Sequence, residues 1–252
     1  MHFPRKVLSV CLLVLGFAMA SPSFAASDDA LSAAQRTQIE EIIHQYLLNN
    51  PKVIIEAVNR MQVAEDAAKK ANAKQALANS HEQLINDPDA PIGGNPKGDV
   101  TVVEFFDYRC GYCKKVHPSL IKLIDSDKNL RFVYKEFPIL GPQSIIASKA
   151  ALAVSRIAPA KYQEYHDVLM TSQGALTKAI VLKMAANVGI DADAVGKEME
   201  VPEIEKIIHK NYKLAQQLNI NGTPAFVIGD QLLPGAADYD TLKDMIAKAR
   251  GS

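Results

Sequence analysis

The sequence predicts an α/β domain that carries an inserted helical region and follows an all-helical segment. Two observations lead to this prediction. From residue 100 onward, β-branched and aromatic stretches alternate with helical ones in the order strand, helix, strand, helices, strand, strand, helix, which is typical of α/β proteins. From Leu31 to Ile85 the chain instead has helical periodicity and few turn signals. The Pro- and Gly-rich stretch "NDPDAPIGGNPKGD" separates the two parts.

The first 25 residues have the pattern of a secretory signal peptide. Arg5 and Lys6 supply a positive n-region, and "VLSVCLLVLGFAMA" supplies a short apolar h-region. "SFA", which ends at Ala25, offers small residues at the cleavage position. The apolar run is shorter than the roughly 20 residues that a membrane-spanning helix needs. We therefore expect an exported protein from which this segment is removed.

Charge excludes one class of partner. The chain has 28 basic and 28 acidic residues, and removal of Arg5 and Lys6 leaves 26 against 28, a net charge of −2. This balance argues against nucleic acid as a partner. Removing 25 of the 252 residues leaves 227, enough for one sizeable domain and an appendage.

The N-terminal helical segment has a break in its middle. Ser32 is placed to cap a first helix, and Asn50-Pro51 predicts a stop followed by a new start. The apolar faces comprise Ile39, Ile42, Ile43, Tyr46 and Leu47 in the first helix and Ile54, Ala57, Met61, Ala64, Ala68 and Ala71 in the second. The three- and four-residue steps of the second helix are those of a coiled coil. The segment is either a helical layer on its own domain or, as we favour, a self-association arm.

The strands and helices of the second part follow from composition and period. Strands are expected at "VTVVEFF" (100–106), "LRFVYKEF" (130–137), "NGTPAFVIG" (221–229) and "QLLPGA", and a closing helix at 238–249. The expected domains are a signal peptide at 1–25, a helical oligomerisation segment at 26–86, a linker at 87–99, and an α/β domain at 100–252 with a helical insertion at about 142–219.

Cys110 and Cys113 are the only cysteines that remain once Cys11 leaves with the signal peptide. A disulfide between them would close a ring too small to constrain the unfolded chain, so the pair serves chemistry rather than stability. Cys110 lies where a strand passes into a helix, and a helix N-terminus lowers a thiol pKa. Cys113, one turn later, should face the interior and act as the resolving sulfur of a mixed disulfide.

Other uses of the cysteine pair fit less well. Covalent haem attachment needs a histidine at the position of Lys114. Zinc needs two more ligands; His117 offers one, and the other histidines lie far off in sequence. Two alternatives to redox exchange stay open: an exported copper- or zinc-binding protein that uses Cys110, Cys113 and His117, and a surface interaction protein whose thiols are incidental.

The segments "VVEFFDYRCGYC" and "GTPAFVIG", with helices inserted between them, resemble the thioredoxin-fold disulfide oxidoreductases of the bacterial periplasm, in their DsbA-like branch. The resemblance covers about residues 98–252, and it implies a thioredoxin-like fold and a periplasmic location. The helices before it look similar to those of the self-associating ScsC-like proteins and of the DsbA-like proteins associated with macrophage infectivity.

The resemblance implies roles for the two cysteines and for the residues at the cis-proline. Cys110 matches the family nucleophile and Cys113 the resolving cysteine. Pro224 matches the cis-proline that faces the pair, and Thr223 offers backbone hydrogen bonds to an extended substrate. A cis X–Pro bond is usually a deliberate feature, and proline has no N–H to compete for the sulfur. The alternative for Pro224 is an ordinary edge-strand proline.

Glu104 is an acid inside an apolar strand, and burial there should raise its carboxyl pKa. It matches the family's buried acid near the resolving cysteine, which relays a proton, and Lys135 on the second strand is its expected partner. The alternative for both is an ion pair with no redox role. Phe105, Phe106 and Tyr108 are expected in the core and at the rim of the site.

Three residues differ from DsbA itself. The central dipeptide is Gly111-Tyr112 rather than Pro-His, and Thr223 rather than Val precedes the cis-proline, as in disulfide isomerases of the superfamily. Without a histidine between the cysteines, less charge stabilises the Cys110 thiolate, so we expect a less oxidising couple.

The resemblance therefore implies a thiol–disulfide oxidoreductase that acts as an isomerase, or as a mixed oxidase and isomerase, on unfolded or misbridged secreted proteins. The cysteine pair carries the electrons, so no dissociable cofactor is expected. The expected partners are a DsbB- or DsbD-like membrane redox protein and other copies of the chain, in a homodimer or homotrimer formed through residues 26–86.

Overall fold

A computed structural model describes residues 31–251, so the predicted signal peptide lies outside the described residues. The chain divides into two compact units, Met1–Arg60 and Met61–Ser252. Between residues 31 and 251, no helix combines the length and the apolar character needed to cross a membrane.

The described part of the first unit consists of α1 (Ala33–Asn49) and the beginning of α2 (Lys52–Asn79). Ser32 caps α1 in a reciprocal box with Gln35: the Ser32 Oγ accepts from the Gln35 N–H, and the Gln35 Oε1 accepts from the Ser32 N–H. No side chain of α1 is buried, and Ile42 and Tyr46 are 68% and 55% exposed. A single chain thus leaves the apolar face of α1 uncovered.

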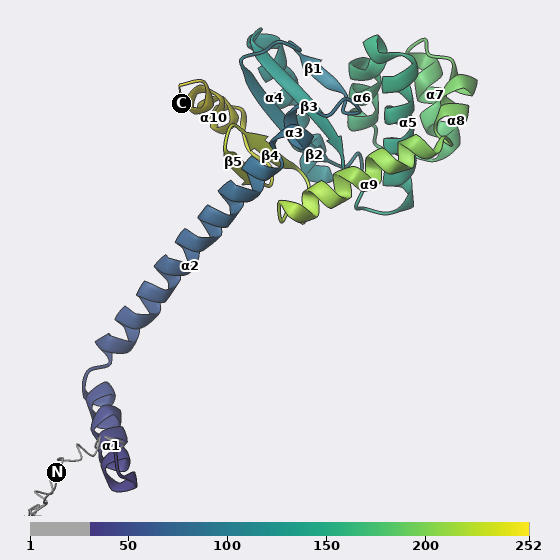
Figure 1. The fold of residues 1–252 in the computed structure, drawn as a ribbon. Helices are drawn as coiled ribbons and strands as arrows, with labels where there is room; N and C mark the ends of the chain where they lie inside the picture. Colours follow the sequence, from purple (N-terminus) through teal and green to yellow (C-terminus); the bar gives the residue numbers. More distant parts are fainter. Residues whose placement is uncertain (1–30, 252) are drawn as a thin grey trace, which may run out of the picture. The chain divides into compact units, whose positions relative to one another are not determined.

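The second unit contains one five-stranded sheet, shown in Figure 1. Its strands are β1 (Ile92–Gly94), β2 (Val100–Phe106), β3 (Leu130–Glu136), β4 (Ala225–Ile228) and β5 (Gln231–Pro234). Their order is β1-β3-β2-β4-β5, with β2 and β3 parallel and the other neighbours antiparallel. The strands connected by the cysteine-bearing helix therefore lie at the centre of the sheet.

The helices of the second unit fall into two groups. The sheet helices are the C-terminal part of α2, α3 (His81–Ile85), α4 (Gly111–Ser126), α9 (Pro202–Gln217) and α10 (Tyr239–Arg250). The others are α5 (Pro142–Ile157), α6 (Tyr162–Thr171), α7 (Lys178–Asn187) and α8 (Ala192–Glu198), which pack on one another. All helices from α5 to α9 lie between β3 and β4 in sequence, so the expected helical insertion is confirmed (Figure 1).

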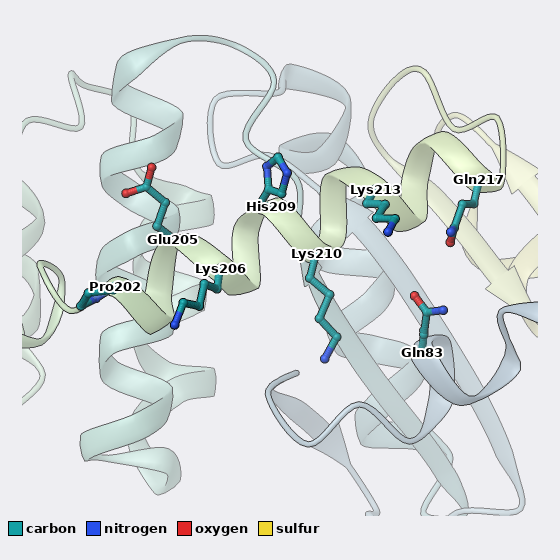
Figure 2. A pocket seen from close by; sticks show the side chains of 8 residues that line it. All are labelled: Gln83, Pro202, Glu205, Lys206, His209, Lys210, Lys213 and Gln217. Atoms are coloured by element: carbon teal, nitrogen blue, oxygen red, sulfur yellow. The ribbon is translucent and has the colours of Figure 1, made fainter.

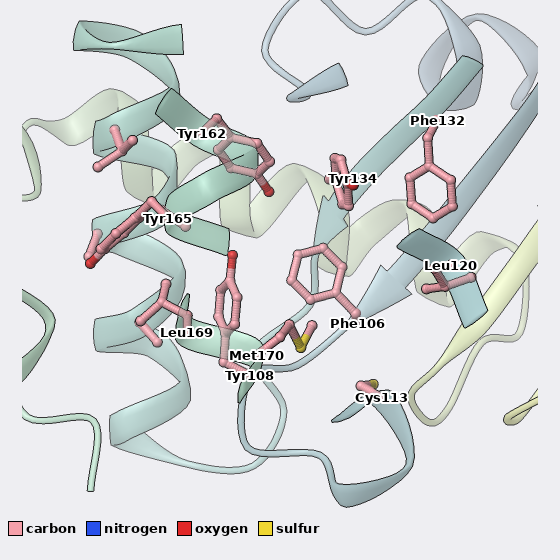
Figure 3. Close-up of a cluster of buried hydrophobic side chains, with 14 of the residues drawn as sticks. Phe106, Tyr108, Cys113, Leu120, Phe132, Tyr134, Tyr162, Tyr165, Leu169 and Met170 are labelled. Atoms are coloured by element: carbon pink, nitrogen blue, oxygen red, sulfur yellow. The ribbon is translucent and has the colours of Figure 1, made fainter. Parts of the chain in front are cut away.

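Each face of the sheet carries its own core. On one face, alternate residues of β2 and β3, such as Val102, Phe106 and Phe132, pack against α4, α10 and the helical insertion. Figure 3 shows aromatic side chains of the strands and of α6 gathered in this core, with Cys113 and Leu120 coming from α4. On the other face, the residues between these, such as Val103, Phe105 and Val133, pack against the end of α2, α3 and the last turns of α9. Phe105, Phe106 and Tyr108 are all fully buried, as expected.

The structure corrects the predicted linker and the boundary before it. β1 lies inside residues 87–99 and pairs with β3, with Ile92 opposite Val133. Leu77 and Leu84, from the expected oligomerisation segment, are 6% and 2% exposed in the core of the second unit. A three-residue strand that ends in two glycines has no alternation for sequence reasoning to detect, so the pattern indicated only a linker.

Asp87, at the start of the predicted linker, anchors this segment to the sheet. Its carboxylate accepts a hydrogen bond from the Lys135 Nζ at 2.5 Å and another from the Lys210 Nζ at 2.5 Å. The side chains of Asp87 and Lys135 are 1% and 0% exposed. Desolvation raises the pKa of Asp87, but the hydrogen bonds from the two lysines, the charge of Lys135 and the backbone N–H of Asp89 together hold that pKa below its usual value. The carboxylate is therefore stabilised in its charged form.

We predict that Asp87→Ala destabilises the protein by about 3 to 5 kcal/mol, because it leaves the buried Lys135 ammonium without a negative charge beside it, with only the Gln83 carbonyl oxygen to accept from it. Urea unfolding followed by circular dichroism measures the change. Asp89→Ala is the matched control, since Asp89 is exposed and contacts Lys210 at 3.3 Å, and it should change the free energy of unfolding by less than about 1 kcal/mol. Equal effects of the two substitutions would contradict this account.

Candidate active site

Cys110 lies at the junction of β2 and α4, where the sequence predicted a helix start. It is the N-cap residue of α4, and its carbonyl oxygen accepts the first helical hydrogen bond from the Lys114 N–H at 3.0 Å. The loop before it is held by the buried Asp107, whose carboxylate accepts from the Arg109 N–H at 2.7 Å and from the Leu140 N–H at 2.9 Å. Asp107 thus fixes the position of the cysteine relative to the loop after β3.

The loop before β4 lies against the sulfur of Cys110. The Thr223–Pro224 peptide bond is cis, as expected, and the Thr223 carbonyl oxygen lies 3.2 Å from the Cys110 Sγ. Pro224 is buried and Thr223 is half-buried. A small pocket of about 140 Å³, lined by residues 219–225 and by β5, adjoins this loop. An extended peptide could meet the backbone of Thr223 here beside the sulfur.

The two sulfurs, both free thiols, differ sharply in acidity. A hydrogen bond from the Cys113 thiol lowers the pKa of Cys110 to about 5. Desolvation acts in the opposite direction and is outweighed. The side chain of Thr223 and the backbone N–H groups of Cys113 and Tyr112 lower the pKa further. Burial raises the pKa of Cys113, and the hydrogen bond to Cys110 and the charge of Glu104 raise it further. At neutral pH one sulfur is a thiolate and the other a thiol.

Glu104 is buried on the same face of the sheet as the cysteines. Its side chain is enclosed, and neither carboxylate oxygen has a hydrogen-bond partner among the described residues. Burial raises the pKa of Glu104 to about 8, and the negative charges of Cys110 and Glu136 contribute. The expected burial and raised pKa are confirmed.

The expected pairing of Glu104 with Lys135 is wrong. In the β2–β3 register Glu104 lies opposite Tyr134, and Lys135 lies opposite Phe105, so the two side chains point to opposite faces of the sheet. Lys135 pairs instead with Asp87. Two opposite charges in neighbouring apolar strands favour an ion pair only if both side chains point to the same face of the sheet. The alignment of β2 with β3 decides this, and the sequence pattern does not reveal that alignment.

Glu136 is a second buried acid, which the sequence reasoning missed. It accepts hydrogen bonds from the Ser148 Oγ at 2.6 Å, the Tyr108 Oη at 3.0 Å and the Tyr162 Oη at 3.4 Å. Burial raises its pKa to about 8, against the effect of these three donors. The sequence contains the pattern that could have identified it, because Glu136, like Glu104, is an acid within an apolar β-strand.

The central dipeptide of the motif is open to solvent. A side chain added at Gly111 would meet no atom within 4 Å, and Tyr112 is 67% exposed. Neither residue contributes a side-chain hydrogen bond to the sulfurs, although the Tyr112 backbone N–H is among the groups that lower the pKa of Cys110. The contribution of Tyr112 to the lowered pKa of Cys110 thus comes from its backbone, and a tuning role of its side chain stays a prediction.

Lys114 joins this helix to the helical insertion. Its Nζ donates to the carbonyl oxygens of Leu169, Met170 and Ser172 at 3.3, 2.9 and 2.8 Å. A cation at the C-terminal end of a helix is favourable, because the unpaired carbonyls there carry partial negative charge. The position where haem attachment would need a histidine thus holds α4 against α6.

A separate cavity of about 650 Å³ runs along the exposed side of α9. Figure 2 shows its lining: Pro202, Glu205, Lys206, His209, Lys210, Lys213 and Gln217 from α9, and Gln83 from α3. None of the residues discussed for the cysteine site lines it. The cysteine site therefore lies outside this cavity, where the loop that ends at Cys110 meets the loop before β4.

The structure does not gather the ligands of the alternative metal site. Among the described residues, the group of histidine, cysteine or acidic side chains close enough to share an ion is His117, His166 and Asp167, with ligand atoms within 4.8 Å of one another. Cys110 and Cys113 are not part of it. A site made of the two cysteines and His117 is thus not formed here.

The comparisons with known proteins agree with this geometry. Residues 101–247 match the family model of the DSBA-like thioredoxin domain, and residues 35–75 match that of the copper resistance protein ScsC N-terminal domain. A thioredoxin-like oxidoreductase from Silicibacter pomeroyi is 44% identical, with a TM-score of 0.65 over 68% of this chain and 98% of that one. A linker-deletion mutant of Proteus mirabilis ScsC is 30% identical, with a TM-score of 0.69 over 89% of this chain and 99% of that one.

Curated relatives of two classes match the chain. Disulfide bond formation protein D of Bacillus subtilis is 26% identical over 63% of this chain and 76% of its own length. Sodium/proton antiporters of Salinispora species also match, but the chain spans only 28% and 29% of their lengths. The matched domain, the strand–helix junction at Cys110 and the cis-proline loop before β4 together decide the family: the chain belongs to the DSBA-like thioredoxin domain proteins, with a thioredoxin-like fold and an ScsC-type N-terminal segment.

Proposed function

We propose that this protein is a periplasmic thiol–disulfide isomerase with oxidase capacity, which rearranges or forms disulfides in secreted proteins through Cys110 and Cys113. The observation that carries the proposal is the unequal acidity of the two sulfurs: the pKa of Cys110 is lowered to about 5 and that of Cys113 is raised. An isomerase needs a sulfur that attacks readily and a second sulfur that does not displace the substrate at once.

The exchange steps follow from this difference. The Cys110 thiolate attacks a substrate disulfide, forms one S–S bond, breaks one, and releases a substrate thiolate. If another substrate thiolate attacks the mixed disulfide, a different substrate disulfide closes and Cys110 is restored, which is isomerisation. If Cys113 attacks, the Cys110–Cys113 disulfide closes and the substrate leaves reduced. Because Cys113 is held as a thiol, the first route has time to occur.

Glu104 is the base that we propose for the second route. Its pKa is raised to about 8 partly by the negative charge of Cys110. That charge disappears when Cys110 enters a mixed disulfide, so the pKa of Glu104 falls and its carboxylate can accept the proton of Cys113. Deprotonation of Cys113 is thereby linked to the presence of a bound substrate. Attack by Cys113, which releases the substrate, is therefore slow while Glu104 is protonated and faster once Glu104 has ionised.

The N-terminal segment supports a second part of the proposal, self-association. Residues 35–75 match the ScsC N-terminal domain, and large apolar side chains of α1 and the beginning of α2 are exposed in the single chain, among them Ile42, Ile43 and Ile55. Contiguous exposed apolar surface of this kind marks an interaction site. Linked active sites would raise the local concentration of thiolates around one substrate, which favours repeated exchange over release.

Location, substrates and partners follow as further proposals. The family and the signal-like N-terminus support a periplasmic protein that meets unfolded or misbridged secreted proteins. The match to a copper resistance protein makes chains misbridged during copper stress a suitable substrate class. An isomerase must be kept reduced, so a DsbD-like membrane reductant fits better than a DsbB-like oxidant.

We predict that Cys113→Ala retains substrate as a mixed disulfide on Cys110, because the resolving sulfur is missing. Non-reducing gels and mass mapping of protein from oxidising cells identify the linked cysteine. Cys110→Ser should trap no substrate and should not restore activity to scrambled ribonuclease. Mixed disulfides on Cys113, or a Cys110→Ser variant that still refolds ribonuclease, would contradict the assigned roles.

We predict that Glu104→Gln slows resolution of a mixed disulfide by about tenfold or more near neutral pH, because general-base assistance is lost. In the wild type this rate should rise with pH as Glu104 loses its proton and should level off below about pH 8, because the charge of Cys110 that helps to raise the pKa of Glu104 is absent from the mixed disulfide. The variant should lack that rise. Stopped-flow reduction of a disulfide peptide measures it. Alkylation of Cys110 at pH 6 is the internal control and should be unchanged, since Glu104 is then protonated and neutral.

The same substitution has a stability signature with a definite sign. The folded wild type holds the Glu104 proton up to about pH 8, whereas the unfolded chain releases it near its ordinary value of 4.5. Its contribution to stability is therefore complete below the unfolded pKa and is lost as the pH rises through the folded one. Glu104→Gln should flatten this fall. An identical pH dependence in the two proteins would show that Glu104 is not held protonated.

We predict that the double variant Ile42→Lys/Tyr46→Lys is monomeric, because two charges replace apolar side chains on the uncovered face of α1. It should reduce insulin like the wild type but refold scrambled ribonuclease about tenfold more slowly or worse. Gln45→Lys, an exposed polar position on the same helix, is the matched control. A monomeric wild type by light scattering, or a monomeric variant with full isomerase activity, would refute the role of the arm.

A further inference from the structure

A polar cluster lies under the cysteine-bearing helix and is not used by the proposed exchange reaction. His117 lies on α4 one turn after Cys113, and His166 and Asp167 lie on α6 of the helical insertion. The His117 Nε2 and the Asp167 Oδ1 are 3.2 Å apart, and the rings of the two histidines are 5.4 Å apart between centroids. The ligand atoms of all three side chains lie within 4.8 Å of one another.

One nitrogen of this cluster has no partner. His166 is fully buried, and its Nε2 makes no hydrogen bond with any described residue. Its other nitrogen, Nδ1, lies 3.0 Å from the Tyr108 Oη. A buried polar atom without a hydrogen bond costs roughly 1 to 3 kcal/mol, so such atoms in native proteins usually await a water or an ion. Because Nδ1 is engaged, Nε2 is the nitrogen that remains to bind a ligand.

The surroundings of His166 resemble the support of a metal-binding histidine. Tyr108 donates to Glu136 at 3.0 Å, and His166 Nδ1–H can donate in turn to the Tyr108 oxygen. In this series of hydrogen bonds the proton of His166 is on Nδ1, and Nε2 keeps a free lone pair. Metal-bound histidines characteristically donate their second N–H to a fixed acceptor, which sets the tautomer and the ring orientation.

The three side chains also differ in a way that suits ion entry. His166 is 0% exposed and the side chain of His117 is 7% exposed, whereas that of Asp167 is 38% exposed. Two imidazoles thus form the interior of the cluster, and one carboxylate completes it at the surface. The Asp167 Oδ1 also accepts a hydrogen bond from the Gln163 Nε2 at 2.8 Å, so an ion would share that oxygen with Gln163 or displace its amide. Zinc bonds of about 2.0 to 2.2 Å require ligand atoms at most about 4.2 Å apart. The His117 Nε2 and the Asp167 Oδ1, at 3.2 Å, already meet this requirement.

We propose that His117, His166 and Asp167 form a binding site for a divalent first-row transition-metal ion, of which Zn²⁺ is the test ion. Two imidazoles and one carboxylate are a ligand set that zinc accepts, with a fourth position left for water. The site lies between α4 and α6, so a bound ion joins the cysteine-bearing helix to the helical insertion. It is distinct from the thiol site, and its existence does not depend on the proposed exchange activity.

The test uses the full chain with Cys110 and Cys113 oxidised to a disulfide, so that no thiolate can bind the ion. Isothermal titration with Zn²⁺ should give one ion per chain. Co²⁺ should give visible ligand-field bands of a nitrogen and oxygen site without the near-ultraviolet charge-transfer band of a thiolate. Saturating Zn²⁺ should also raise the unfolding midpoint, because the ion binds the folded state.

Two substitutions assign the site. Asp167→Asn should weaken Zn²⁺ binding by about tenfold or more and reduce the gain in unfolding midpoint, while Glu164→Gln, an exposed acid of the same helix, should change neither. Tyr108→Phe should weaken binding by about 10- to 100-fold through the loss of the second hydrogen bond. Absence of 1:1 binding by the oxidised wild type would overturn the proposal without any variant. So would a thiolate-type Co²⁺ spectrum, or equal affinities of wild type and Asp167→Asn.

Discussion

A contact of 3.2 Å joins the Cys110 sulfur to the carbonyl oxygen of Thr223, and it brings together loops that are 113 residues apart in the chain. The central strands β2 and β4 are antiparallel neighbours, so the end of one lies beside the beginning of the other. The proposed thiol–disulfide exchange depends on this arrangement. It places the Cys110 sulfur at the N-terminal end of α4, the Cys113 thiol one turn further along the helix, and the half-buried backbone of Thr223 beside Cys110.

The site accommodates very few negative charges at a time. Cys110, Glu104 and Glu136 lie in one desolvated region, and the charge of the first and the third contributes to the raised pKa of Glu104. Removing one charge therefore makes the next ionisation easier. A redox cycle removes and restores the charge of Cys110, so it also moves protons among these groups. Burial is in this sense part of the chemistry and not only of the stability.

Local signals in the sequence were enough to predict much of this site. Cys110 and Cys113 followed an apolar strand, and Glu104 interrupted one, so the helix N-terminus and the buried acid could both be inferred. The cis-proline came from the resemblance of "GTPAFVIG" to a known family, and the structure bears it out. The expected weakening of the thiolate without a central histidine stays a prediction; within this chain the hydrogen bond from the Cys113 thiol supplies the largest stabilisation.

The features that were missed depend on register and packing. Lys135 was paired with the wrong acid because the face of a side chain follows from strand alignment. Asp87 and β1 lay in a stretch whose prolines and glycines suggested a linker. His117 and His166 are 49 positions apart in sequence, and only the packing of α6 on α4 brings them together. No periodicity or spacing encodes such a meeting.

The most direct test of the central claim is a pH titration of the reduced protein, followed by the ultraviolet absorbance of thiolate. The account predicts that one thiolate, on Cys110, forms with a midpoint near pH 5, and that the second sulfur stays protonated throughout the neutral range. The Cys110 midpoint should rise in Cys113→Ala, because the largest stabilising hydrogen bond is lost. A single step in which both sulfurs ionise near the ordinary value of 9.0 would contradict it.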